Sequence, residues 1–80
     1  MDKEEGSEEI EWTVNEWLQH KYGNHLIHVD FINLWKESGI FIVDCNVTVK
    51  KGVMGKEMLT FKFQVSGLGK ILGYKTLSAD

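Results

Sequence analysis

The hydrophobic pattern of this 80-residue chain changes period once, near Gly23, and this change restricts the fold class more than any other feature. Before Gly23, apolar residues recur at the spacing of one helix face. They are Ile10, Val14, Trp17, Leu18 and Tyr22. Ser7 suits the position just before a helix, and Gly23 can take the positive φ that often follows one. The pattern therefore predicts a helix over residues 8–22.

After Gly23, apolar and polar residues alternate, which is typical of strands with one buried face. Three alternating runs are separated by turn residues, and a shorter fourth run follows. They begin at Ile27, Phe41, Leu59 and Ile71, and the last run ends at Leu77. We therefore predict an α+β fold in which one N-terminal helix packs on an antiparallel meander of three to four strands, α-β-β-β-β. We expect a single domain over residues 1–80, with a flexible acidic tail at 1–6 and the sheet at 25–77.

The first turn sets the expected register of the sheet. A three-residue loop, Glu37-Ser38-Gly39, places Gly39 in the left-handed conformation at a bulge. This loop pairs Trp35 with Phe41, Phe31 with Cys45, and Val29 with Val47. The odd-numbered apolar residues then share one face, which we expect the helix to cover.

The second hairpin is expected to turn around residues 52–55, which pairs Val47 with Phe61 and Cys45 with Phe63. The predicted core combines the apolar helix face with the odd-numbered strand residues. It consists of Ile10, Val14, Trp17, Leu18, Ile27, Val29, Phe31, Phe41, Val43, Cys45, Val47, Leu59, Phe61, Phe63, Val65 and Ile71. The opposite face of the sheet is expected to meet solvent or a partner.

Composition restricts the compartment and the partners. The single cysteine, Cys45, excludes an internal disulfide and fits a reducing compartment. The first residues are acidic, unlike a signal peptide, and no apolar run approaches the ~20 residues of a membrane span. We therefore expect a cytoplasmic protein with no membrane among its partners.

Charge is distributed unevenly along the chain, which contains no arginine. Residues 1–16 hold seven acids and one lysine, whereas residues 50–75 hold six lysines and one acid. Such asymmetry indicates the kind of partner rather than the fold. On the face of the sheet opposite the helix, which we call the open face, the lysines predict an anion-binding site. Such a site can also hold single-stranded nucleic acid, although the absence of arginine disfavours nucleic acid as the ligand. The site consists of Lys50, Lys62, Lys70 and Tyr74.

The first hairpin predicts a second kind of surface. Its even-numbered positions place four large aliphatic residues opposite the helix. They are Ile32, Leu34, Ile40 and Ile42. An exposed cluster of this kind is unusual in a monomer and predicts a homodimer or a protein partner, unless a bulge near Ile32 turns some of these residues inward. Trp12, which lies outside the apolar helix face, is a further candidate contact.

We find no constellation that predicts catalysis, a metal or a cofactor. His25 and His28 point to opposite sides of a strand, so they do not converge with His20. Cys45 falls on the core face, where a thiol behaves as a small hydrophobe. The Gly67-Leu68-Gly69-Lys70 segment precedes a strand, so it is a turn rather than a phosphate loop. The helix glutamates form a solvated face.

The segment Phe61-Lys-Phe-Gln-Val65, followed by Gly69-Lys70-Ile71 and Gly73-Tyr74, resembles PepSY-like small domains. Those domains also place a helix before a meander that ends in a strand, a turn with glycine and a hydrophobic strand. The chain also resembles, in general style, small archaeal α+β proteins. These resemblances imply a helix-on-meander fold and assign no functional residue.

The patterns together predict a small non-catalytic protein-interaction module that binds a protein partner or a second copy of itself through the open sheet face. The alternative is a protein that binds anions or single-stranded nucleic acid through the lysine-bearing part of that face.

Overall fold

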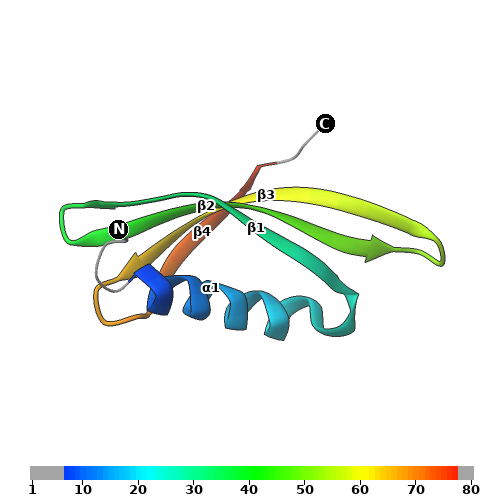
Figure 1. Ribbon diagram of the computed structural model, residues 1–80, viewed down its shortest axis with the longest axis horizontal. Coiled ribbons are helices and arrows are strands. Elements are labelled where there is room, and N and C mark those ends of the chain that lie inside the picture. The colour runs from blue at the N-terminus through cyan, green and yellow to red at the C-terminus, as the bar shows by residue number, and fades with distance from the viewer. Residues whose placement is uncertain (1–6, 78–80) are drawn as a thin grey trace.

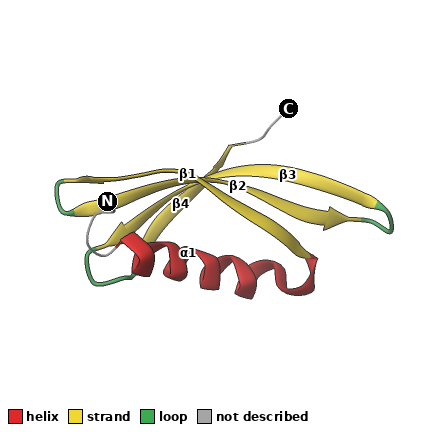
Figure 2. Cartoon of the chain, viewed as in Figure 1, coloured by secondary structure: helices red, strands yellow, loops and turns green. Residues whose placement is uncertain are grey.

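The structure, a computed structural model, describes residues 7–77 as one helix followed by four strands (Figure 1, Figure 2). The elements are α1 (Ser7–Tyr22), a short 3₁₀ turn (Gly23–His25), β1 (Leu26–Glu37), β2 (Ile40–Lys51), β3 (Gly55–Ser66) and β4 (Ile71–Leu77). The strands form one antiparallel sheet in the order β1-β2-β3-β4, and α1 lies across one face of it. The predicted α-β-β-β-β fold is confirmed, whereas the tail predicted at 1–6 lies outside the described residues.

Helix α1 begins and ends close to the predicted boundaries. Ser7 is its first residue rather than the residue before it, and Glu8 and Glu9 lie in the first turn, where carboxylates interact favourably with the helix dipole. Gly23 follows the last residue with a φ of +57°. This conformation costs glycine little but costs other residues about 1–2 kcal/mol, so the glycine explains where α1 stops.

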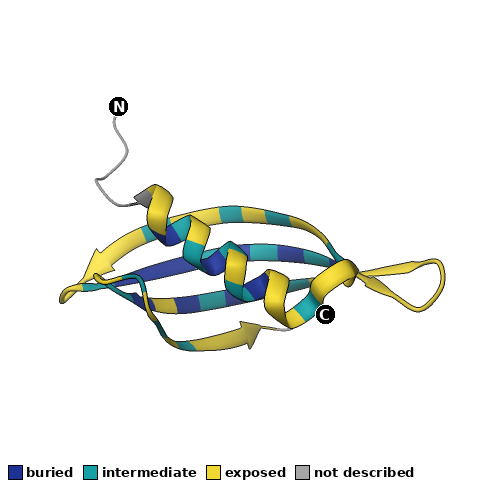
Figure 3. Ribbon diagram, turned by 90° about the horizontal axis from the view of Figure 1, so that it is seen from below, coloured by how far each residue is buried: buried dark blue, intermediate teal, exposed yellow. Residues whose placement is uncertain are grey.

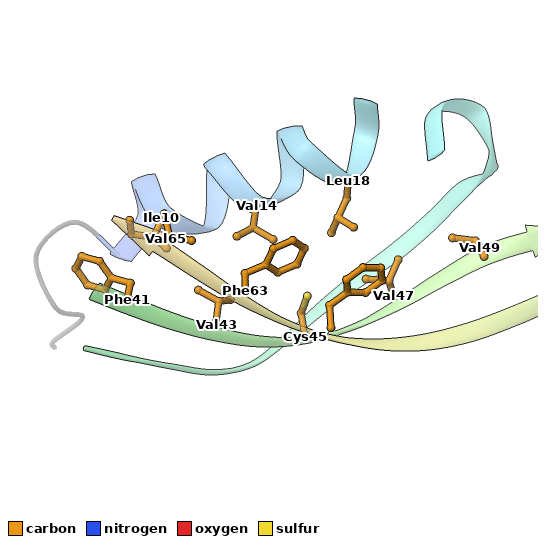
Figure 4. Packing of buried hydrophobic residues seen from close by; sticks show 11 residues of the cluster. Ile10, Val14, Leu18, Phe41, Val43, Cys45, Val47, Val49, Phe63 and Val65 are labelled. Carbon is orange, nitrogen blue, oxygen red and sulfur yellow. The ribbon is translucent and has the colours of Figure 1, made fainter. Parts of the chain in front are cut away.

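The core lies between α1 and the two central strands. Ile10, Val14 and Leu18 project from one side of α1 toward β2 and β3 (Figure 4). The buried cluster is completed by Phe41, Val43, Cys45, Val47, Val49, Phe61, Phe63 and Val65. Seen from the helix side, the buried stretches of the two middle strands lie beneath α1 (Figure 3). The predicted helix face and the predicted sheet face thus meet each other.

An aromatic cluster joins α1 to β3 and β4. The centroid of the Trp17 ring lies 5.2 Å from that of Phe63 and 4.7 Å from that of Tyr74. Phe61 and Phe63 stack with their centroids 5.4 Å apart. Aromatic pairs of this kind contribute about 0.5–1.5 kcal/mol each beyond the area that they bury. A few large side chains therefore hold the helix in place.

The turn between β1 and β2 is shorter than predicted. Glu37 pairs with Ile40, so that Ser38 and Gly39 alone form the loop, with φ values of 51° and 80°. Two successive positive φ values are typical of a type I′ turn, whose twist matches that of the strands it connects. The predicted three-residue loop is therefore wrong, although Gly39 does take a left-handed conformation.

A bulge at Ile32 holds the extra residue that was expected in the turn. The β1–β2 ladder passes over Ile32, which opposes no residue of β2. Beyond it, the predicted pairs of Phe31 with Cys45 and of Val29 with Val47 are confirmed. The bulge thus compensates for the shorter loop, because each solution adds one residue to β1 relative to β2.

On the turn side of the bulge, the register differs from the prediction by one residue. Leu34 pairs with Val43, and Trp35 pairs with Ile42 rather than with Phe41. A slip of one residue moves each side chain to the other face of the sheet. Leu34 consequently packs against the core, and Trp35 lies on the open face.

The β2–β3 pairing is displaced by two residues. Cys45 pairs with Phe61, and Val47 pairs with Leu59. The predicted pairs of Val47 with Phe61 and of Cys45 with Phe63 are therefore wrong. An even displacement leaves every side chain on its original face, so the composition of the core is not affected.

A second irregularity in β1 changes one predicted core residue. The ladder passes over Ile27, and this side chain, which was assigned to the core, is exposed. Leu26 packs against the core in its place. Val49, which the predicted core omitted, is buried, and the remaining predicted residues are either buried or packed against the buried cluster.

Replacing Trp17 by alanine should lower the free energy of unfolding by about 3 kcal/mol, because it removes the ring that contacts Phe63 and Tyr74. Chemical denaturation of dilute protein measures this change. Trp12→Ala is the matched control: Trp12 is 65% exposed, so the same substitution should change stability by less than about 0.5 kcal/mol. Equal losses in the two variants would contradict the packing described here.

Candidate binding surface

The face of the sheet opposite α1 carries a stack of three side chains from neighbouring strands. The register places Asp44 of β2 opposite Lys62 of β3 and sets Trp35 of β1 beside them. Lys62 Nζ lies 5.0 Å from the centroid of the Trp35 ring and 3.1 Å from Asp44 Oδ1. We call these three residues the Trp35 stack.

The Trp35 stack is partly open to solvent. Trp35 is 36% exposed, and the side chains of Lys62 and Asp44 are partly exposed. A cation–π contact at such a site contributes about 0.5–1 kcal/mol, and a solvent-accessible ion pair contributes about 0–1 kcal/mol. Because these interactions are weak, the ring and the ammonium group remain able to contact another molecule.

An apolar residue and a hydrogen-bonded pair lie beside the stack. Ile42 is only 8% exposed although it is outside the cluster beneath α1, because Trp35 and Gln64 flank it on the adjacent strands. The Thr60 hydroxyl donates a hydrogen bond of 2.9 Å to the side-chain oxygen of Asn46. Cross-strand pairs of this kind stabilise a sheet, so the face is an ordered surface.

The bulge separates the four aliphatic residues that were predicted to form an interaction surface. Leu34 packs against the core, and Ile42 is nearly buried. Ile40 is half-buried at the start of β2, and Ile32 is exposed at the bulge itself. Trp12 is exposed on the outer side of α1. The structure therefore does not join these residues into one exposed patch.

The predicted anion-binding residues are also separated. Tyr74 lies on the helix side of β4, so its predicted position on the open face is wrong. The reason is that the β3–β4 ladder passes over one residue near the start of β4. Lys75, instead of Tyr74, lies opposite Lys62, while Lys50 is near the end of β2 and Lys70 is in the β3–β4 turn.

Sequence reasoning missed Trp35, Asp44 and Lys75 on this face. Strict alternation places Trp35 on the face beneath the helix because it is odd-numbered. One usable signal was present, since the apolar positions of β1 are odd-numbered over residues 27–31 and include the even-numbered Leu34 afterwards. Such a change of parity within one strand indicates a bulge.

The histidines do not form a common site. His28 Nε2 lies 3.7 Å from Asp30 Oδ1, and both side chains are exposed. His20 is on α1, and His25 is in the 3₁₀ turn. Within residues 7–77, no three His, Cys, Asp or Glu side chains are grouped so that they could hold a metal ion.

Cys45 is buried on the helix side of β2. Burial raises the pKa of its thiol to about 12, and the negative charge of Asp44 adds to the shift. The thiolate is the nucleophilic form of cysteine, and a thiol with this pKa is protonated at neutral pH. Cys45 therefore serves as a small apolar residue of the core.

Comparison of the chain with protein-family models, with curated proteins and with solved structures finds no match. The resemblance to PepSY-like domains and to small archaeal α+β proteins therefore stays a prediction from the sequence. Within residues 7–77, no helix combines the length and the apolar character needed to cross a membrane.

The raised pKa of Cys45 predicts that alkali destabilises the fold. The thiol ionises near its ordinary pKa of 9.0 in the unfolded chain and only near 12 in the folded chain. Its contribution is therefore fully present below the ordinary pKa and is lost as the pH rises toward 12, at up to about 1.4 kcal/mol per pH unit.

Denaturation of the wild type and of Cys45→Ala across this alkaline range measures the contribution. The stability advantage of the wild type over the variant should shrink as the pH rises, because only the wild type carries the thiol. An advantage that does not change with pH would contradict the assignment.

Proposed function

We propose that this chain is a small non-catalytic interaction module of the cytoplasm that binds a protein partner through the open face of its sheet. The Trp35 stack is the observation that supports this proposal. Tryptophan is enriched among the residues that dominate protein interfaces, and Trp35 lies beside the nearly buried Ile42 and the partly exposed Lys62. Because α1 covers the other face, a partner on this face would complete a third layer.

The lysines of β3 and β4 indicate the charge of the partner. Lys62 and Lys75 lie directly opposite each other, and like charges in this arrangement repel. Asp44 pairs with Lys62, and no carboxylate among residues 7–77 pairs with Lys75. A protein segment that combines carboxylates with an apolar side chain would therefore fit, with the carboxylates near Lys75 and the apolar group against Trp35.

A second candidate function is the binding of anions or single-stranded nucleic acid. The exposed ring of Trp35 favours it, because a base could stack on the indole while phosphates approach Lys62 and Lys75. Lys50 and Lys70 would then contact other phosphates of the nucleic acid. We rank this function second because arginine, the residue that forms forked contacts with phosphate, is missing from the chain.

An NMR titration of isotope-labelled protein separates the two functions. The probes are an acidic peptide rich in glutamate and leucine, the same peptide with lysine in place of glutamate, and single-stranded oligothymidylate. We expect only the acidic peptide to shift the indole N–H signal of Trp35 and the amide signals of Lys62 and Lys75, because its charge and its apolar side chains match this face.

Lys75→Glu should weaken binding of the acidic peptide about five-fold, the equivalent of about 1 kcal/mol for a lost charge contact. Lys70→Glu is the matched control in the β3–β4 turn and should leave this binding unchanged. If oligothymidylate shifts these signals and both variants bind it more weakly than the wild type does, the second candidate function replaces the first. Signals that respond to no probe would contradict both.

A further inference from the structure

The β2–β3 hairpin extends beyond the rest of the sheet and ends in two exposed apolar side chains. Strand β1 stops pairing with β2 at Val49, whereas β2 and β3 remain paired as far as Lys51 and Gly55. The hairpin therefore forms a projecting arm at one end of the molecule (Figure 1). Val53 and Met54 at its apex are 97% and 89% exposed.

Lysines surround this apex. Lys50 and Lys56 lie directly opposite each other, and Lys51 follows Lys50. Glu57, the nearest acid in sequence, pairs with a core position of β2, so it belongs to the helix side of the sheet. Within residues 7–77, no carboxylate forms an ion pair with any of the three lysines. The tip thus presents an apolar centre with a positive rim.

The outer side of α1 carries the opposite arrangement. Trp12 is 65% exposed there. Residues three and four positions away lie beside it on the helix surface, and these include Glu8, Glu9 and Glu16, all exposed. We call these four residues the Trp12 patch, an aromatic centre with a negative rim.

The tip and the Trp12 patch are too far apart to meet within one molecule. The longest dimension of the molecule is 41 Å, and the tip lies at one end of it, while the first turns of α1 lie toward the other (Figure 1). The view from the helix side shows the same separation (Figure 3). The tip of one molecule can therefore contact only the Trp12 patch of another molecule.

We propose that the hairpin tip of one copy binds the Trp12 patch of a second copy. Val53 and Met54 contact the indole ring, where a methionine sulfur is favourable beside an aromatic group. The three lysines of the tip face the three glutamates of the patch. This contact uses neither Trp35 nor Lys75, so it is independent of the proposed function.

The geometry determines the kind of assembly. The two surfaces differ, so a single contact leaves one tip and one patch free, and association continues into a chain or closes into a ring in which every tip and patch is used. The contact involves only a hairpin tip and two helix turns, which is small for a stable interface. Association should therefore be weak, rise with protein concentration and decrease at high salt.

Two variants, each defective in one surface, test the proposal by sedimentation velocity at low salt. Met54→Glu disables the tip and keeps the patch, whereas Trp12→Ala disables the patch and keeps the tip. Both positions are exposed, so both variants should keep the wild-type circular dichroism spectrum. We expect concentration-dependent oligomers for the wild type, monomers for each variant alone, and one-to-one dimers when the variants are mixed.

The mixture is decisive, because it contains one intact tip and one intact patch per pair. A wild type that is monomeric up to millimolar concentration would overturn the proposal, as would a mixture that stays as monomeric as its components. Oligomers that persist in both variants and disappear in Trp35→Ala would overturn it as well, since they would assign self-association to the open face. Reversal of the charge at Lys56 by Lys56→Glu should reduce association in the same way as Met54→Glu.

Discussion

The packing of α1 against β2 and β3 is the contact on which the rest of the structure depends. A chain of 80 residues buries only a small core, and here one helix face and one sheet face supply it. Trp17 extends the contact to β4 through Tyr74. Because α1 is the only α-helix among residues 7–77, covering one face of the sheet leaves the other face open. The open face is thus a consequence of a two-layer fold with a single helix.

Most of the fold could be predicted because the hydrophobic period changes at one point, but the fine register could not. An extra residue in β1 can lie in the turn at Gly39 or within the strand at Ile32, and both solutions give the same pairs in the distal half of the hairpin. With the extra residue in the turn, the side chain of Trp35 faces the helix. With the extra residue at Ile32, the side chain of Leu34 faces the helix instead. The twist of a type I′ turn favours the second solution, and this choice puts an aromatic ring on the candidate site. Tyr74 was misplaced for a similar reason, since the ladder passes over a residue of β4 that periodicity does not reveal.

The uneven charge along the chain becomes a separation in space. Among residues 7–77, the ion pair of Lys62 with Asp44 and the contact of His28 with Asp30 are both local to the sheet. The glutamates of α1 and the lysines of the hairpin tip lie in distant parts of the molecule, where salt screens their attraction beyond about 10 Å. These charges therefore contribute little to the stability of the fold and are available for contacts between molecules. The open face and the two ends of the molecule thus have separate roles in our proposals.

The most direct test records amide NMR spectra of the labelled wild type from dilute to concentrated solution at low salt. These spectra show whether the surfaces that the fold leaves exposed bind other molecules. We predict that concentration shifts the signals of residues 50–56 and of residues 8–16, while the signals of the buried strand positions and of Trp35 stay in place. High salt should reverse these shifts. Signals that do not depend on concentration, or that move first around Trp35, would contradict the assignment of the charged ends to self-association.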